Sequence, residues 1–488
     1  MLTIEYVPSV LAALEAAFPT PPNRAKQQLD KYLALLQREM RLCLLKRSPL
    51  ARKYNAYDIP LTKLINGSPT INNKRWRVHE WLNANGIALV QNINKHANNI
   101  TRETAVLKPT QFLIVNNDNL LKYLQSLSAT EIDVYLATLT KDWQDLIDDY
   151  QSDFNSLSFQ VRSTLYFTSP VDIDSLKNYI KKIVQGSTLM SRLDQENAVV
   201  QAEYVLRLAQ VNSGLLHQKI DKKAFGRTYY EGVSVLSTRK ELRMAFLGAS
   251  WEYDCKSCST AWKMSFASQW HAQKKTRKLD VRHSFAAMTL YLEDKEAFFD
   301  AVILEVYNSQ PTPENKVTIK EAMTALGFGA KLSIGTWRSD TGEAAQSSLH
   351  KVFDKDTVVL KRFVDCDLVK KFNSEQQTLN KFIIARFSGD ALWQAEMTAE
   401  QQRKKIKKFS QSQKMVWLYQ HAETIMMDMV RSEVIKSGNT ILANVHDAVV
   451  VRDQIPANLL AMIESSVQQQ TGVDYFSLGE TEYSFVES

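Results

Sequence analysis

An aspartate in a setting typical of a metal ligand occurs in the segment WEYDCKSCST. Asp254 ends an apolar and aromatic run, Met244–Leu247 with Trp251 and Tyr253, and small polar residues follow it. Aromatic residues at helical spacing between 259 and 270 predict a helix directly after this run. We therefore expect Asp254 at the end of a strand, exposed in a cleft where its carboxylate could bind a cation.

A second aspartate, Asp447, lies between two apolar runs of β-branched residues. The segment TILANVHDAVVVR, residues 440–452, predicts two strands joined by a tight turn at His446 and Asp447. Polar residues at a hairpin tip are commonly turn residues and nothing more. Metal chemistry on phosphates, however, needs carboxylates brought together from distant parts of a chain. Asp447 is thus the candidate partner for Asp254.

A third segment, KVTIKEAMTALGFGAK at 316–331, predicts a helix with a cationic face. Lys316, Lys320 and Thr324 are four residues apart, and Phe328 and Gly329 continue the row. Two ammonium groups followed by a ring suit a triphosphate and then a base or sugar. The alternative is an ordinary amphipathic helix with exposed lysines.

Two smaller features are open to more than one interpretation. Gly226 and Arg227 form a basic turn, which is more often a surface turn than a ligand site, and a β-rich stretch is expected from this turn to Asp254. Cys255 and Cys258 form a CxxC that could be a redox pair or half of a zinc site. No second CxxC or nearby His pair completes such a zinc site.

Length and composition set broad limits on the fold. With 488 residues the chain exceeds what one hydrophobic core usually holds, so several structural regions are expected. Amphipathic patterns at Ala25–Leu45 and Asp118–Tyr150 predict a mostly helical region over residues 1–200. The net charge of +7 permits nucleic acid without requiring it. Four scattered cysteines favour a reducing cytoplasm, and no run reaches the roughly 20 apolar residues of a membrane span.

In chain order, the Gly-Arg pair, Asp254, the K-x3-K-x7-FG helix and His446–Asp447 resemble the palm and fingers motifs of family A DNA polymerases and phage-type single-subunit RNA polymerases. The resemblance lies in short segments between about 220 and 488. It implies an α+β, helix-rich fold of the right-hand polymerase type, with palm, fingers and thumb, an antiparallel palm sheet and a helical N-terminal region. The implied domains are 1–200 (helical N-terminal region with the thumb), 201–265 (first part of the palm), 266–420 (fingers) and 421–488 (second part of the palm).

The resemblance also implies a reaction, template-directed nucleotidyl transfer. Asp254 and Asp447 would bind two metal ions, with the backbone carbonyl of Cys255 as a further ligand. Mg²⁺ is the expected ion and Mn²⁺ the alternative. Arg227 and His446 would contact nucleic acid, with Arg227 on the primer or template backbone.

The same resemblance assigns roles to the predicted helix. Lys320 would neutralise the triphosphate and protonate the pyrophosphate leaving group, and Lys316 would hold the outer phosphates as a point charge. Thr324 belongs to the same nucleotide-binding face. Phe328 would stack near the nascent base pair, and Gly329 would allow close approach of the template.

Residues near the two aspartates bear on the sugar of the substrate. Within the resemblance, the position five after Asp254 carries a bulky glutamate in the DNA polymerases, and the small Ser259 here leaves room for a ribose 2′-hydroxyl. Ala448 after Asp447 also agrees with the RNA branch, whereas Phe328 replaces the tyrosine usual in that branch. The leading hypothesis is a DNA-dependent, ribonucleotide-accepting RNA polymerase or primase-polymerase of a phage or plasmid.

Two alternatives stay open: a small replicative DNA polymerase without proofreading, and a degenerate polymerase fold that only binds nucleic acid. The implied partners are a DNA template, NTPs and in some readings dNTPs, and a replication or transcription protein bound through the N-terminal region. The expected location is the cytoplasm of a bacterial or phage-infected cell, with no membrane contact.

Overall fold

The computed structural model describes residues 2–19, 22–45, 54–71, 76–93, 104–138, 143–188, 190–221, 226–273, 280–338, 344–354, 356–404 and 408–483. The chain forms two compact units and passes from one to the other several times. Unit 1 contains Met1–Asp221, Tyr229–Ser250 and Tyr483–Ser488, and unit 2 contains Lys222–Thr228 and Trp251–Glu482. Within the described ranges, no helix combines the length and apolar character needed to cross a membrane.

Unit 1 contains helices with short strands between them. In chain order its elements are β1 (Leu2–Tyr6), α1 (Pro8–Ala17), α2 (Pro22–Leu44), β2 (Tyr57–Pro60), α4 (Leu61–Gly67), β3 (Thr70–Ile71), β4 (Trp76–Arg77), α5 (Val78–Ala84), β5 (Val90–Asn92), β6 (Thr104–Pro109), β7 (Leu113–Asn117), α6 (Leu120–Gln125), α7 (Ala129–Ala137), α8 (Gln144–Asn155), α9 (Phe159–Leu165), β8 (Tyr166–Pro170), α10 (Ile173–Val184), α11 (Arg192–Val211), β9 (Leu215–Asp221), β10 (Tyr229–Tyr230) and α12 (Lys240–Leu247).

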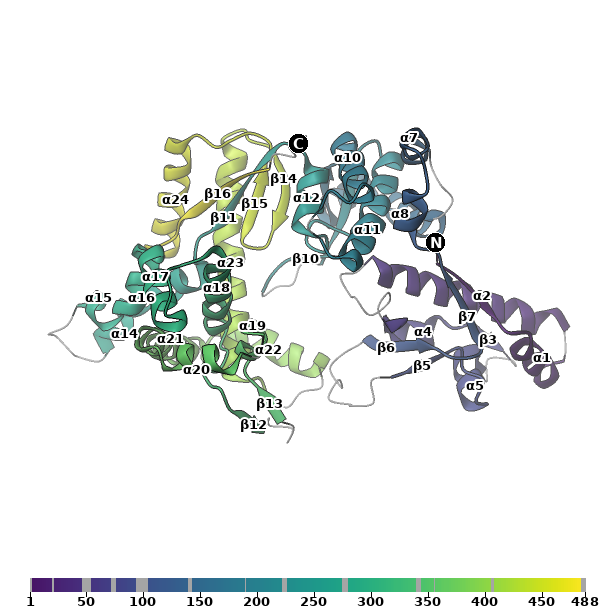
Figure 1. The fold of residues 1–488 in the computed structure, drawn as a ribbon, viewed down its shortest axis with the longest axis horizontal. Coiled ribbons are helices and arrows are strands. Elements are labelled where there is room, and N and C mark those ends of the chain that lie inside the picture. The colour runs from purple at the N-terminus through teal and green to yellow at the C-terminus, as the bar shows by residue number, and fades with distance from the viewer. Residues whose placement is uncertain are drawn as a thin grey trace. The chain divides into compact units, whose positions relative to one another are not determined.

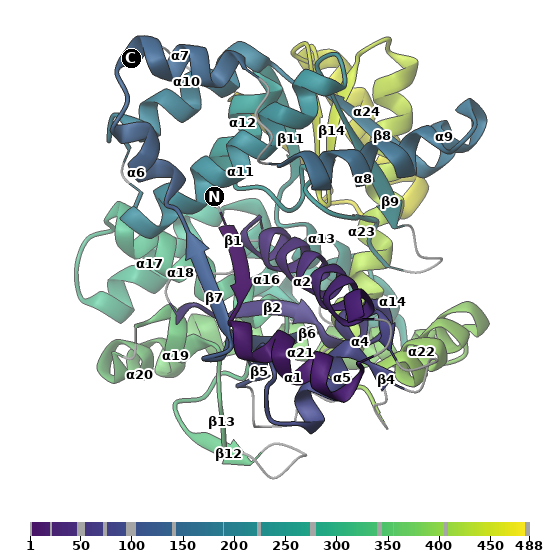
Figure 2. The ribbon, with the colours of Figure 1, turned by 90° about the vertical axis from the view of Figure 1, so that its right-hand side faces the viewer.

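Small antiparallel sheets and long helices make up the core of unit 1. Strand β1 pairs with β7, β2, β6 and β5 form one three-stranded sheet, and β10, β9 and β8 form another. Helix α2 packs against β1 and β2 (Figure 2). Helix α10 packs against α11 and α12 (Figure 1), and α11 is buried along most of its length.

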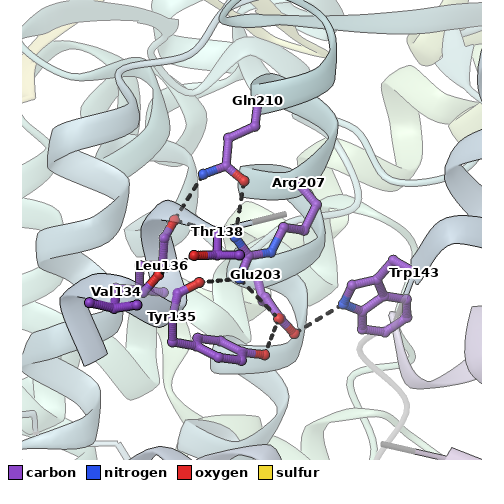
Figure 3. Close-up of polar contacts among 8 residues, drawn as sticks. All are labelled: Val134, Tyr135, Leu136, Thr138, Trp143, Glu203, Arg207 and Gln210. Carbon is purple, nitrogen blue, oxygen red and sulfur yellow. Dashed lines mark hydrogen bonds and ion pairs between the residues drawn. The ribbon is translucent and has the colours of Figure 1, made fainter. Parts of the chain in front are cut away.

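A buried polar cluster joins α7 to α11 (Figure 3). Glu203 and Arg207 are almost fully buried and form an ion pair one helical turn apart. The Glu203 carboxylate accepts hydrogen bonds from the Tyr135 hydroxyl and, at 3.0 Å, from the Trp143 indole N–H. Arg207 donates to the backbone carbonyls of Tyr135 at 3.0 Å and Leu136 at 3.3 Å. These partners offset the cost of burying both charges, so the cluster fixes α7 on α11.

Unit 2 holds all the residues that the sequence singles out for chemistry. Its elements are β11 (Ser250–Cys255), whose first residue belongs to unit 1, α13 (Cys258–Met264), α14 (Ala267–Gln273), α15 (Val281–Ser284), α16 (Ala286–Glu293), α17 (Lys295–Tyr307), α18 (Pro313–Gly327), β12 (Thr336–Arg338), β13 (Ala344–Gln346), α19 (Leu349–Val352), α20 (Thr357–Asp365), α21 (Asp367–Phe387), α22 (Ala391–Lys404), α23 (Gln411–Lys436), β14 (Ile441–Val445), β15 (Ala448–Val451), α24 (Ala457–Thr471) and β16 (Leu478–Tyr483), whose last residue belongs to unit 1.

A four-stranded sheet in the order β14-β15-β11-β16 positions the aspartates (Figure 1). Strand β15 has the sequence AVVV and is buried at every residue, as expected for a central strand covered on both faces. Strand β11 is antiparallel to β15, with Tyr253 opposite Val449. Asp254 is exposed directly after the fully buried Tyr253, close to the end of β11.

Helix α21 is central to the helical part of unit 2. It packs against α13, α16, α18 and α23. The apolar residues of these helices belong to one core that also includes Tyr253 and Val449 of the sheet. Helix α18 begins with Thr312 as the N-cap, whose hydroxyl accepts a hydrogen bond from the Asn315 N–H, followed by a proline at the first helical position. Sequence and packing therefore agree on where the cationic helix starts.

The helix-rich α+β fold with antiparallel sheets is confirmed, and some local expectations are wrong. Residues 240–247, expected within a β-rich stretch, form helix α12 because Leu242, Ala245 and Phe246 bury one helical face. The single aromatic helix expected over 259–270 is divided between α13 and α14.

The N-terminal half shows similar differences. Helix α2 matches the pattern at Ala25–Leu45, but Asp118–Tyr150 contains α6, α7 and the start of α8. Ser128 begins α7 through a capping box with Glu131, so this stretch contains a separate helix start. The first 200 residues are helix-rich, and strands β1 to β8 were not indicated by the sequence. The division into palm, fingers and thumb stays a prediction.

Candidate functional site

Asp254 and Asp447 lie at the same end of neighbouring strands. The hairpin predicted at 440–452 is confirmed, with β14 and β15 antiparallel around His446 and Asp447. Asp254 is opposite Ala448, the residue after Asp447, and the Cys255 N–H donates to the Asp447 carbonyl oxygen at 2.8 Å. His446 has φ +47°, the left-handed conformation that two-residue hairpin loops require at their first position. Hairpin geometry thus places the two distant aspartates side by side.

Negative charge accumulates around Asp447. Its pKa is raised to about 6, first by burial and then by the charge of Glu423. Asp254 adds to this effect, while the backbone N–H of Asp447 and the guanidinium of Arg227 oppose it. Carboxylates that repel one another in a partly buried site favour protonation or the binding of a cation.

The absence of a side chain at Gly479 leaves space for the Asp254 carboxylate. Strand β16 flanks β11, and the Lys256 N–H donates to the Ser477 carbonyl oxygen at 2.9 Å. A Cβ atom at Gly479 would lie 2.5 Å from Asp254 Oδ1 and 3.3 Å from Lys256 Cε. Since 2.5 Å is too short for a carbon–oxygen contact, any side chain at 479 would displace the carboxylate.

Arg227 is bound to a buried glutamate. Its Nε and Nη2 atoms donate to the two carboxylate oxygens of Glu423, each at 2.6 Å, and Glu423 is fully buried. Thr424 Oγ1 also donates to the Gly226 carbonyl oxygen at 3.1 Å. The Gly-Arg turn is therefore fastened to α23, and Arg227 has a partner that the sequence did not indicate.

Helix α18 carries its cationic residues as the sequence predicts. Lys320 and Thr324 are exposed. Lys316 Nζ lies 2.5 Å from a Glu296 oxygen and 3.4 Å from an Asp300 oxygen, both on α17. Lys316 is thus already engaged, so a role on the outer phosphates would require it to leave this ion pair.

Lys295 on α17 interacts electrostatically with both Asp254 and Lys320. Its Nζ donates to Ser257 Oγ at 2.8 Å, just beyond the end of β11. Its pKa is lowered first by burial and then by the positive charge of Lys320, while Asp254 opposes the change. Lys295 therefore lies within electrostatic reach of both, which brings the predicted lysine and the first aspartate to one region.

Phe328 and Gly329 form the turn that ends α18. The Phe328 ring is 39% exposed, and its centroid lies 5.9 Å from that of Tyr419. Gly329 has φ +88°, and a Cβ there would lie 2.6 Å from Ser412 Oγ. Glycine is required here by the backbone and by close packing on α23. The structure gives this reason for Gly329 independently of any template.

Ser259 and the CxxC lie in the first turns after Asp254. Ser259 Oγ is enclosed and has no hydrogen-bond partner among the atoms of the described chain. Cys255 and Cys258 are buried and not disulfide-bonded. Burial and the neighbouring Cys258 raise the pKa of Cys255, which keeps the thiol protonated and makes it a poor metal ligand.

The donor set fits a hard cation held in part by substrate. Among the residues with described positions, no three His, Cys, Asp or Glu side chains gather as a preformed metal cage. Two adjacent carboxylates are what Mg²⁺ commonly takes from a protein when phosphates and water complete its shell. Asp254 and Asp447 provide these two groups, and the Cys255 carbonyl belongs to the same strand end.

Glu423, Lys295 and Gly479 are site residues that sequence reasoning missed. Glu423 had a readable signal, because it continues a buried stripe of α23 that includes Tyr419 and Met427. A carboxylate on an apolar stripe is rarely buried without a charged partner. Lys295 and Gly479 had no such signal, since only the fold brings them to the aspartates.

The arrangement of Asp254, Asp447 and the lysines is the basis for assigning a function. No known protein family matches the sequence, and none of the curated proteins matches it.

Proposed function

We propose that the chain is a template-directed nucleotidyltransferase of right-hand architecture, with the β14-β15-β11-β16 sheet as its palm. The observation that carries this proposal is the meeting of Asp254 and Asp447 on adjacent strand ends, with Lys320 within electrostatic reach through Lys295. Carboxylates beside lysines are what the transfer of a nucleotide from a triphosphate requires.

Each residue would have a definable role. Asp254 and Asp447 would hold Mg²⁺, which supplies charge stabilisation for the attacking and leaving oxygens when bound. Lys320, exposed on α18, would neutralise the triphosphate and give a proton to the leaving pyrophosphate. Lys295 would keep the phosphates at the end of β11, since its Nζ is held there by Ser257.

Ribonucleotides are the substrate that the site residues favour. Ser259 is small, and it leaves the room next to Asp254 that a bulky glutamate at this position would take from a ribose 2′-hydroxyl. Phe328 favours the second candidate, a DNA polymerase, because its ring has no hydroxyl to join a hydrogen-bond network around the ribose 2′-OH. Ring stacking by Phe328 would serve either sugar.

Primer extension on a DNA template tests the proposal. The wild-type chain with Mg²⁺ is expected to incorporate rNTPs, and Asp254→Asn and Asp447→Asn are each expected to reduce incorporation by about 10³-fold or more. Asp453→Asn is the matched control, because Asp453 is an exposed aspartate just past the other end of β15. Incorporation of dNTPs alone would favour the DNA polymerase. No incorporation of either, with retained DNA binding, would favour a binding module.

Ser259→Glu tests the choice of sugar. A glutamate at this half-buried position is expected to reduce kcat/KM for rNTPs about tenfold or more relative to dNTPs, because it would occupy the space of the 2′-hydroxyl. Ser259→Ala, which keeps the space, should leave the ratio within about twofold. An equal loss of both substrates with Ser259→Glu would show that this residue does not select the sugar.

A further inference from the structure

Lys263 is a fully buried lysine that the catalytic proposal does not use. It lies in α13 and is 0% exposed. Its Nζ donates to the Gly327 carbonyl oxygen and to Gln376 Oε1, each at 2.7 Å. Burial lowers its pKa to about 7, and none of the carboxylates in the described ranges forms an ion pair with it. A buried amine without a counter-charge is costly, so a merely space-filling role would suit an apolar residue better.

The two acceptors join three helices. Gly327 is the last residue of α18, and its carbonyl is one of those that a helix end leaves without a partner in the helix. Gln376 lies on α21, and its Nε2 donates to Thr260 Oγ1 of α13 at 3.3 Å. Lys263 and Gln376 thus tie the end of α18 to the helix that follows Asp254. An ammonium group at this helix end also suits the negative end of the helix dipole.

The carbonyl that accepts the hydrogen bond from Lys263 belongs to Gly327, the residue before Phe328. The Phe328 N–H donates to the Thr324 carbonyl oxygen at 3.1 Å, and the Gly329 N–H donates to the Leu326 carbonyl oxygen at 2.9 Å. Beyond these local bonds, the Phe328 ring is partly exposed beside Tyr419. The bond from Lys263 therefore links the last turn of α18 to α13, while Ser412 Oγ of α23 donates to the Gly329 carbonyl oxygen at 3.3 Å on the other side of Phe328.

We infer that Lys263 is a positioning residue that holds the last turn of α18, and with it Phe328, in register with Asp254 for nucleotide binding. This inference rests on the proposed function for its consequence in catalysis, but its geometric part can be tested without activity. Because Lys263 contacts no substrate in this scheme, its loss should weaken nucleotide binding more than it slows the chemical step.

Spin labels on α18 test the geometric part. Thr324 and Val317 are exposed at opposite ends of the helix, and all four natural cysteines are buried, so Thr324→Cys and Val317→Cys can be labelled selectively. Lys263→Met removes the amine at nearly constant volume. It is expected to increase label mobility at 324 and not at 317. Lys381→Met, an exposed lysine on α21, is the matched control and should change neither.

Kinetics of the unlabelled variants test the catalytic part. Lys263→Met is expected to raise KM for the nucleotide about tenfold while kcat falls less than about threefold. Unchanged mobility at 324 in a folded Lys263→Met protein would overturn the inference, as would an unchanged KM. If Lys263→Met does not fold, Gln376→Met can replace it, since it removes one acceptor of Lys263 and the link to Thr260. It should increase label mobility at 324 and raise KM, each by less than Lys263→Met would. An inactive wild type would refute the proposed function, and the spin-label comparison would still decide the positioning role.

Discussion

A carboxylate surrounded by other carboxylates must either take up a proton or hold a cation. Asp447 is in this position, because burial and then the charges of Glu423 and Asp254 raise its pKa, while a backbone N–H and the guanidinium of Arg227 oppose the change. The site is thus electrostatically unfavourable without a cation, which is a common property of functional sites. If the charge of Asp447 lowers the stability of the fold, replacing this residue by a neutral one should raise the free energy of unfolding.

Asp447→Asn should stabilise the metal-free protein at high pH. A folded-state pKa of about 6, above the usual value of 3.8, means that the contribution of Asp447 to stability is present below about pH 4 and lost as the pH rises through 6. At pH 8 the asparagine variant is therefore expected to unfold with a free energy higher by about 1–2 kcal/mol, after allowing for partial exposure. Urea unfolding in EDTA from pH 4 to 8 measures this difference, and Asp453→Asn serves as the control. A difference that does not grow with pH would contradict the charge balance inferred for the site.

Gly479→Ala should harm activity without harming the fold. The added methyl group would lie 2.5 Å from Asp254 Oδ1, and the end of an exposed side chain can move aside at little cost in stability. We expect less than about 1 kcal/mol of destabilisation and a loss of about 10²-fold in primer extension, because the displaced carboxylate no longer faces Asp447. Gly389→Ala, at a glycine with open space around it, is the control for both measurements. Full activity in Gly479→Ala would mean that the position of Asp254 is not critical.

At the scale of elements, the loop of Arg227 and helix α23 are held together by a bidentate ion pair. Arg227→Met would leave Glu423 as a buried charge without its partner, and we expect it to cost about 3 kcal/mol. The double variant Arg227→Met/Glu423→Leu should regain much of this loss, since neither charge remains. Urea unfolding of both singles and the double gives the coupling energy. The pair Arg431–Asp428 on the same helix has an exposed carboxylate in place of a buried one, and it should give less than about 1 kcal/mol in the same cycle. An equal coupling in both pairs would contradict the role of carboxylate burial.

The elements also show what the sequence can and cannot predict. The hairpin at 440–452 and the cationic helix were predictable, because a β-branched pattern around a polar pair and lysines four apart are local signals. Helix α12 was not, since its short apolar face also fits a strand. Gly479 and Lys295 could not be assigned at all, because their relation to Asp254 depends on pairing of β16 with β11 and on packing of α17. Partners that are distant in sequence are fixed by tertiary structure alone.

At the scale of the whole molecule, each unit has a core of its own, although neither is a continuous segment. The chain crosses between units near residues 221, 228, 250 and 482, and the site residues named above all belong to unit 2. Separate cores predict separate cooperative transitions. A ligand that binds only one unit should then stabilise only that unit's transition.

Calorimetry is therefore expected to resolve two unfolding transitions. Leu206→Ala, at a fully buried position of α11 in unit 1, should lower one of them, and Leu379→Ala, at a fully buried position of α21 in unit 2, should lower the other. Mg²⁺ with an NTP at ten times its Kd should stabilise only the transition that Leu379→Ala lowers, by about 1.4 kcal/mol, because that unit carries Asp254, Asp447 and Lys320. Asp254→Asn should abolish the nucleotide effect and leave both transitions in place. A single transition lowered equally by both leucine variants would show that the units unfold as one, and a nucleotide shift on the Leu206 transition would place the binding site outside unit 2.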